Sequence, residues 1–190
     1  MAFRHPMRGL GLRPGEVSDL PAIEAASHSA CVSREVLELV EGRFGDHSRL
    51  AGLCCRYPSQ CLVAYRRDRV IGCIAWRQDE FVGVLLAHVV MQEFQDLGIG
   101  TALVRGFVEH AREDGLRLLE LRVPALLERA GRIYLREGFR ETGRWIYLNR
   151  GGNTLRAAAD DSARITHLEE ARYRRGQTWC QYERKFSGKG

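Results

Sequence analysis

The sequence predicts a mixed α/β fold. Three β-branched or apolar runs follow one another with short polar links, which is typical of an antiparallel meander. Further along, the pattern changes to strand, helix, strand, helix, and such a run needs a crossover connection between parallel strands. Hydrophobic residues make up 45% and charged residues 28% of the 190 residues, as is ordinary for a soluble globular protein.

The first elements are read from capping residues and apolar spacing. Residues 8–13 form a short extended segment. Ser18 or Asp19 then caps a helix that runs to about Ala30. Apolar positions at helical spacing predict one or two further helices within 33–56.

Three strands follow in quick order, at 61–65, 70–76 and 81–90. The polar turns 66–69 and 77–80 separate them. Links this short predict that the three strands pair antiparallel.

A glycine-punctuated turn precedes the segment 98–114, whose apolar residues repeat as one face of a helix, and Gly115 ends it. No internal repeat or second domain is visible, so we expect a single domain over 1–190 with its core at about 8–186. The remaining expected elements are a strand at 118–123, a helix at 126–137, strands at 139–148 and 178–186, and a helix from about 162 to 175.

Cysteine and histidine spacing argues against a metal site. The six cysteines form no C-x-x-C pair and the six histidines are scattered singly, whereas zinc ligands cluster at regular spacing. We therefore predict reduced cysteines and no metal. The basic start has no apolar stretch with a cleavage site, and no apolar run approaches a membrane span. We expect a cytoplasmic protein with no membrane partner.

The net charge of +5 favours a solvated surface over a nucleic-acid site, because the arginines alternate with acids along the chain. Arg172, Arg174 and Arg175 either attract an acidic acceptor or form a solvated basic face. We expect no nucleic-acid partner.

The most informative stretch is 89–101, where a strand turns directly into a helix through Gly98 and Gly100. The first N–H groups of a helix lack internal partners, and the peptide dipoles leave about half a positive charge there. Glycine lets the backbone approach phosphate oxygens closely. Two spaced glycines also serve tight turns that bind nothing. A dinucleotide-binding fingerprint fits less well, because the third glycine falls at Gly106, outside the required spacing.

Two motifs resemble those of the GNAT superfamily of N-acetyltransferases. Residues 95–100, Gln-Asp-Leu-Gly-Ile-Gly, resemble its acetyl-CoA signature, Gln/Arg-x-x-Gly-x-Gly/Ala. Residues 130–139 resemble its later helix pattern, Ala-x-x-x-Tyr-x-x-x-Gly-Phe. The resemblance implies the GNAT-like fold, a central, mostly antiparallel sheet that is splayed at the cofactor site and has helices on both faces. By element order it covers about residues 8–186.

The resemblance also implies a site and its chemistry. Acetyl-CoA would be the acyl donor, and an amine would attack the thioester directly, with CoA leaving as thiolate. A backbone donor of the strand 89–91 would hold the acetyl carbonyl, and such a donor is worth about 3 kcal/mol. Leu127 stands where the family often has an asparagine. The implied cofactor-binding residues are Val89, Val90, Met91, Gln95, Asp96, Leu97, Gly98, Ile99, Gly100, Thr101 and Tyr134.

Tyr134 and His88 are the candidate catalytic residues. Tyr134 falls where the family places a tyrosine near the CoA sulfur, as hydrogen-bond donor or general acid; without the motif it would be a core residue. An acceptor amine must lose a proton, and His88 shares the strand parity of Val84 and Leu86 and is the titratable residue among them. A single histidine in an apolar strand is also commonly structural. Weaker candidates for a base are Asp79, Glu80 and Glu120.

The leading hypothesis is an N-acetyltransferase that uses acetyl-CoA and acts on a primary amine of a small molecule or a protein. The alternative is a non-catalytic acyl-CoA-binding or interaction module of the same fold. A homodimer is expected only from the general frequency of such assemblies.

Overall fold

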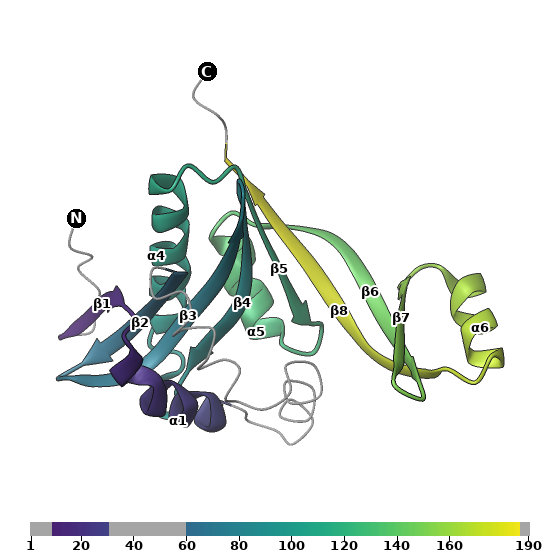
Figure 1. The fold of residues 1–190 in the computed structure, drawn as a ribbon, viewed down its shortest axis with the longest axis horizontal. Helices are drawn as coiled ribbons and strands as arrows, with labels where there is room; N and C mark the ends of the chain where they lie inside the picture. The colour runs from purple at the N-terminus through teal and green to yellow at the C-terminus, as the bar shows by residue number, and fades with distance from the viewer. Residues whose placement is uncertain (1–8, 31–59, 187–190) are drawn as a thin grey trace. The chain divides into compact units, whose positions relative to one another are not determined.

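A computed structural model describes residues 9–30 and 60–186 of the chain (Figure 1). Contacts divide it into two compact units, one up to Arg117 and the other from Leu118. Each unit combines strands with helices, which confirms the predicted mixed α/β class. The predictions that fall outside the described residues are the helices within 33–56 and the thiols of Cys31, Cys54 and Cys55.

The first unit contains a meander of four strands in the order β1-β2-β3-β4, each antiparallel to the next. The predicted antiparallel arrangement of the three central strands is therefore confirmed. The elements of this unit are β1 (Leu10–Pro14), η1 (Val17–Asp19), α1 (Leu20–Ala30), β2 (Cys61–Arg66), β3 (Arg69–Asp79), β4 (Val82–Val90), η3 (Gln92–Phe94) and α4 (Ile99–Glu113).

The two hairpins of the meander are tighter than the sequence predicts. Arg66 pairs with Arg69, so the first loop has only Arg67 and Asp68, with φ of 48° and 64°. Two positive φ values in a two-residue loop match the twist of the flanking strands. Pairing thus continues into the expected turn, because each further residue pair adds ladder hydrogen bonds.

Helices α1 and α4 cover opposite faces of the meander (Figure 1). Ile23 of α1 packs in one cluster with Cys73 and Ala75 of β3. On the other face the Trp76 ring lies 4.9 Å from that of Phe107 in α4. Consecutive strand residues point to opposite faces, so this alternation explains why residues 70–76 of β3 are buried on both sides and are all apolar or glycine.

Helix α4 ends as the sequence predicts. Its C-cap is Asp114, and Gly115 follows with φ of 73°, a conformation that glycine adopts without a steric penalty. The amide of Leu116 donates to the carbonyl of Ala111 at 2.9 Å, which satisfies one of the last carbonyls. The side chains that α4 buries are Ile99, Ala102, Leu103, Val104, Phe107, Val108 and Ala111.

The second unit has four strands in the order β5-β8-β6-β7, and each neighbouring pair is antiparallel. Helix α6 packs on β6 and β7 through Ile165 and Leu168, which contact Ile146 and Leu148. The elements are β5 (Leu118–Pro124), α5 (Glu128–Arg136), β6 (Arg140–Arg150), β7 (Asn153–Ala158), α6 (Ser162–Glu170) and β8 (Arg174–Lys185).

Strand β7 is not among the predicted elements, which placed a polar stretch there. Arg150 pairs with Asn153, so Gly151 and Gly152 form a two-residue hairpin loop, and both have positive φ. A Gly-Gly pair between two strand-like runs is a recognised hairpin signal. The strand is hard to recognise otherwise, because four of its six residues are exposed and half of them are polar.

Helix α6 is shorter than predicted. It stops at Glu170, and Arg172 adopts a left-handed conformation with φ of 64°. The amide of Tyr173 donates to Leu168 and that of Arg172 to Glu169, both at 2.9 Å. These two bonds are the Schellman pattern that ends a helix, here with arginine at the position that glycine usually occupies.

Candidate functional site

The turn between β4 and α4 is held by backbone and side-chain hydrogen bonds at its start. The amide of Met91 donates to the carbonyl of Ile71 at 2.9 Å, and the amide of Gln92 donates to Oγ of Ser29 at 3.0 Å. The side chain of Gln95 turns back and donates through Nε2 to the carbonyl of Val90 at 3.1 Å. Gln95 therefore braces the turn against the end of β4.

The turn leads into α4 through two residues with a left-handed backbone conformation, Asp96 with φ of 62° and Gly98 with φ of 81°. Gly98 is the N-cap, and its carbonyl accepts the first helical bond from Ala102 at 3.0 Å. The first-turn amides of α4 therefore precede the helical ladder and carry its positive partial charge. The first turn has no acidic residue, so it suits an anion.

Gly72 lets β4 approach β3 closely where β4 ends. A Cβ atom at this position would lie 2.7 Å from the carbonyl oxygen of Val89. Gly72 pairs with Val90, and Val89 and Val90 are half-buried while Met91 is buried. Sequence reasoning missed this residue, although a glycine inside a β-branched run is a known signal of close backbone approach.

His88 connects β4 to the first turn of α4. Its Nε2 atom is buried, and its ring is hydrogen-bonded to the backbone of Gly100. Burial lowers the pKa of His88 to about 4, because a charged imidazole would lose its hydration, and the bond to Gly100 opposes this shift only in part. The imidazole is therefore neutral at pH 7.

A β-bulge changes which residues share a face with His88. Ala75 pairs with Ala87, but the next pair is Trp76 with Leu85, so Leu86 is the extra residue. After the bulge the alternation is reversed, and Val84 falls on the face of Ala87 and not on that of His88. The parity argument from the sequence is thus wrong for Val84.

Tyr134 belongs to the second unit, where it lies on α5 in an aromatic cluster. Its ring centroid is 5.8 Å from that of Phe139 and 6.0 Å from that of Tyr182. Only 3% of Tyr134 is exposed, and burial raises its phenol pKa above the ordinary value. Burial also raises the pKa of Tyr182 to about 12. Both phenols are therefore protonated at neutral pH.

Gly131 gives Tyr182 the space to pack beneath α5. A Cβ atom at Gly131 would lie 2.8 Å from the hydroxyl oxygen of Tyr182. One turn earlier, Leu127 is the N-cap of α5 and makes no side-chain cap, because leucine has no acceptor for the first amides. The family motif around Tyr134 therefore begins without the polar cap that an asparagine would supply.

Most of the predicted site residues lie in the first unit. They are residues 88–91, at the end of β4, and residues 95–101, in the following turn and the start of α4. Asp79 forms an ion pair with Arg77 at 2.7 Å, and Glu80 has φ of 51° in the next hairpin. Glu80 therefore lies in the turn predicted at 77–80, whereas Asp79 is the last residue of β3 and pairs with Val82.

Gly106 has a packing role in α4. A Cβ atom there would lie 3.0 Å from Leu62 and 3.2 Å from Leu12. Gly106 thus lets α4 lie close to β1 and β2, which explains a third glycine at the wrong spacing for a dinucleotide fingerprint. Within 9–30 and 60–186, no group of three or more His, Cys, Asp or Glu residues could hold a metal ion, and no helix could span a membrane.

Comparison with known proteins places this geometry in context. The family model described as "Acetyltransferase (GNAT) family" matches residues 25–139, more than half of the chain. A curated relative, "Probable N-acetyltransferase 14" of Xenopus tropicalis, is 28% identical over 89 residues, which are 46% of this chain. The chain spans 43% of the length of that relative.

Solved structures share the fold at low sequence identity. The PaiA N-acetyltransferase of Thermoplasma acidophilum, in complex with coenzyme A, has a TM-score of 0.66 at 15% identity, covering 93% of this chain and 99% of its own. The structure of yncA from Salmonella typhimurium, with its cofactor acetyl-CoA, has a TM-score of 0.66 at 13% identity and covers 95% of both chains.

Proposed function

The chain belongs to the acetyltransferase (GNAT) family, whose members use acetyl-CoA as acyl donor, and from this premise we propose that it is an N-acetyltransferase. In this proposal it transfers the acetyl group of acetyl-CoA to a primary amine of a small molecule or a protein. The observation that supports it best is the β4–α4 turn, with left-handed Asp96 and Gly98 and no acid in the first turn of α4.

The pyrophosphate of the donor would bind at the start of α4. Backbone amides at a helix N-terminus hold phosphate oxygens without side chains. Gly100 adds no Cβ of its own to the first turn of α4, and the side-chain Nε2 of Gln95 donates to the carbonyl of Val90 and so braces the turn. Residues 95–101 would therefore contact the phosphates, and the backbone of 89–91 would contact the acetyl end.

The chemical step requires little from side chains. The amine nitrogen attacks the carbonyl carbon of the thioester, the new C–N bond forms, and the C–S bond breaks as CoA leaves with the electron pair. The amine gives up one proton, and the thiolate accepts one. A backbone N–H group in 89–91 would stabilise the oxyanion that exists after the C–N bond has formed and before the C–S bond breaks.

Tyr134 would give its proton, or a hydrogen bond, to the departing thiolate. Its phenol is protonated because burial raises its pKa. A phenol is a weaker acid than a thiol, so a hydrogen bond that strengthens as charge develops on sulfur is the better description of its role.

His88 carries two candidate roles, base and positioning residue. With a pKa near 4 it is neutral, as a base must be, but a general base works best with a pKa near the working pH. Its bond to the backbone of Gly100 favours the second role, in which it holds the phosphate-binding turn against β4. The sequence prediction that His88 is the base stays a prediction, and a pH profile separates the two roles.

Titration with acetyl-CoA tests donor binding. Gly100→Glu places a carboxylate in the first turn of α4, where it suits the helix dipole but repels a pyrophosphate. We expect it to reduce acetyl-CoA affinity by about 100-fold or more without loss of fold.

Gly115→Glu is the matched control for that titration. Gly115 also borders α4 and has φ of 73° with open space around it. The same charge there should cost stability, because of the left-handed backbone, and leave acetyl-CoA binding unchanged. If the wild-type chain does not bind acetyl-CoA, or if both variants weaken binding equally, the assignment of the turn is wrong.

Turnover tests the second half of the proposal. Release of the CoA thiol is measured with a panel of amines that includes free lysine, a polyamine and peptides with free N-termini. Thiol release that depends on the amine supports transfer. Tight acetyl-CoA binding without release across the panel would favour the alternative, a non-catalytic acyl-CoA-binding module.

A further inference from the structure

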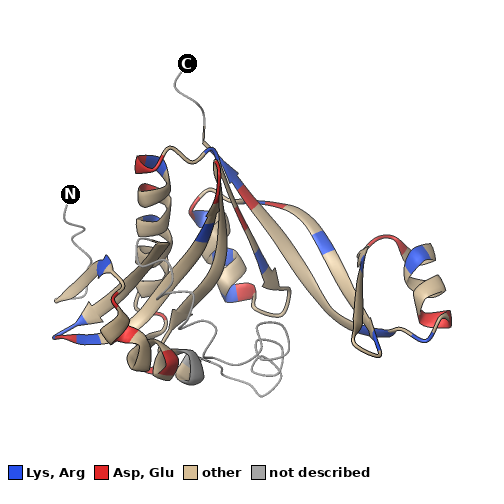
Figure 2. Ribbon diagram, in the orientation of Figure 1, with Lys and Arg blue, Asp and Glu red and all other residues tan. Residues whose placement is uncertain are grey.

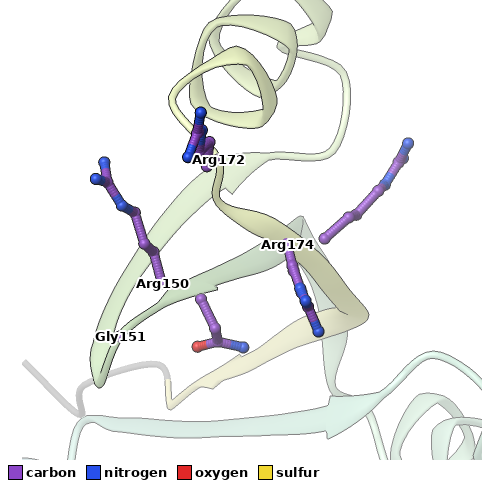
Figure 3. Close-up of a pocket in the computed structure, with 6 residues that line it drawn as sticks. Arg150, Gly151, Arg172 and Arg174 are labelled. Carbon is purple, nitrogen blue, oxygen red and sulfur yellow. The ribbon is translucent and has the colours of Figure 1, made fainter.

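Four arginines surround a hollow at one end of the second unit. Arg150 is the last residue of β6, Arg172 follows α6, and Arg174 and Arg175 begin β8. With Asn149 and Gly151 they line a cavity of about 510 Å³ (Figure 3). All four are exposed.

The carboxylates of the described residues neutralise little of the positive charge of these arginines. Arg150 donates to the carbonyl of Ala171 at 2.9 Å and lies over the Tyr173 ring at 5.9 Å, so its guanidinium is held in place. Within the part of the chain that the structure describes, no carboxylate forms an ion pair with Arg172, Arg174 or Arg175. The nearby acidic residues lie on α6 and just before it (Figure 2).

The hollow also offers donors in excess of acceptors. Oδ1 of Asn149 accepts from the hydroxyl of Thr154 at 2.7 Å, which leaves its amide nitrogen as the group that can face a ligand. Guanidinium groups only donate. A ligand that accepts hydrogen bonds and carries negative charge fits this lining.

The guanidiniums lie on both faces of the sheet. Arg175 pairs with Leu148, whose side chain is in the α6 cluster, whereas Arg174 pairs with Asn149 on the opposite face. In Figure 3, Arg150 and Arg172 extend to one side of the strands and Arg174 extends to the other. A compact anion bound on one face would therefore not contact the guanidinium groups on both faces.

Residues 174–177 of β8, which include Arg174 and Arg175, lie at an edge of the sheet. Strand β5 pairs with β8 only from Trp179 onward. The carbonyl of Thr178 accepts a hydrogen bond from the amide of Ala125 at 2.9 Å. No strand of the described residues pairs with 174–177 on that edge.

We propose that residues 174–177 of β8, with Arg150 and Arg172 beside them, form a docking edge for an extended acidic polypeptide segment. An added strand pairs through its backbone and points its side chains alternately to the two faces. Its carboxylates then meet Arg175 and Arg150 on one face and Arg174 on the other.

This arrangement favours a polypeptide over a nucleic acid. A nucleic-acid strand presents phosphates along one line and bases that need stacking partners, whereas the charges here alternate across a sheet edge. The docking edge lies within the second unit, and its test uses no acyl donor. A failure of the test therefore leaves the proposed transferase activity untouched, and the reverse also holds.

The test is fluorescence anisotropy of labelled decaglutamate with the full chain at physiological ionic strength. We expect saturable binding, and we expect Arg174→Ser/Arg175→Ser to weaken it about tenfold or more. Arg136→Ser/Arg164→Ser is the matched control, because it removes two exposed arginines of the same unit outside the hollow. The control should bind as the wild-type chain does.

Two further probes separate strand pairing from simple charge attraction. Decaglutamate with alternate N-methylated amides keeps every carboxylate but cannot complete a β-ladder, so we expect about tenfold weaker binding. Equal binding of the methylated peptide would overturn strand addition. Three results would overturn the acidic-peptide site: equal loss of binding in both double variants, tighter binding of labelled deca-deoxythymidine, or no binding of decaglutamate. The arginines would then be explained as edge charges that prevent pairing with another strand.

Discussion

The imidazole of His88 is hydrogen-bonded to the backbone of Gly100, so that the end of β4 and the first turn of α4 are joined by a half-buried side chain whose Nε2 atom is buried. This bond links the last strand of the meander to the helix that follows it. It also makes the turn sensitive to the charge of one histidine.

Stability should therefore depend on pH through His88. The pKa of this histidine is about 4 in the folded chain and about 6.5 when unfolded. Between these values the unfolded state binds more protons, so the free energy of unfolding rises with pH across that window and falls on acidification. We expect a change on the order of 1–3 kcal/mol, measured by urea denaturation at several pH values.

His88→Gln is the variant that isolates this effect. Glutamine does not titrate, so the pH dependence between 4 and 6.5 should be smaller than in the wild-type chain. An unchanged dependence would assign the effect to other groups. In the transfer assay, a variant that raises KM for acetyl-CoA with little change in kcat indicates positioning, whereas loss of the acidic limb of the kcat profile indicates a base.

Tyr134→Phe tests the thiolate partner. Removal of the phenol hydroxyl should lower kcat by about 100-fold, while acetyl-CoA affinity stays nearly constant because the aromatic packing on Phe139 and Tyr182 remains. The free energy of unfolding should change by at most about 1 kcal/mol. Full activity of this variant, measured as thiol release, would mean that Tyr134 is only a core residue.

Gly131 and Tyr182 should be strongly coupled in stability. Gly131→Ala alone brings a methyl group 2.8 Å from the Tyr182 hydroxyl, and we expect a loss of about 1–3 kcal/mol from this overpacking. In a Tyr182→Phe background the same change should become neutral or stabilising by up to about 1 kcal/mol, because alanine favours the helix. Thermal unfolding of the four chains measures the coupling, and additive effects would contradict the contact.

Arg172→Gly should separate stability from binding at the docking edge. Arginine at φ of 64° is strained, whereas glycine is the usual residue at this helix end. We expect the variant to gain about 0.5–1 kcal/mol of stability and to bind decaglutamate more weakly. A variant that is more stable and binds equally well would show that Arg172 contributes nothing to the edge.

Several elements could be predicted from the sequence because their signals are local. The apolar period of α4 and the glycine after it depend on residues within a few positions of one another, and α4 was predicted to within a residue of Ile99–Glu113. The turn before it was recognised through two glycines and a motif. The same holds for the hairpin strands β2 to β4, whose order follows from the short links between them.

Other features depend on partners that are distant in the chain. The extra residue Leu86 arises from pairing with β3, so no strand parity counted along β4 alone could place Val84 on the correct face. Gly72 and Gly131 look like ordinary glycines until Val89 and Tyr182 are placed against them. Strand β7 was missed because half of its residues are polar and most are exposed, so that pairing with β6 defines it more than its composition does.

Backbone preference, apolar period and capping residues act over one or two turns. They already specify the mixed α/β class, most of the helices and strands, and the glycine-containing turn before α4. Register, bulges and the depth at which His88 and Tyr134 are buried arise when separate segments pack, because desolvation and close contact are properties of the assembled neighbourhood. For that reason the sequence could name these two residues, while their protonation states followed only from the folded chain.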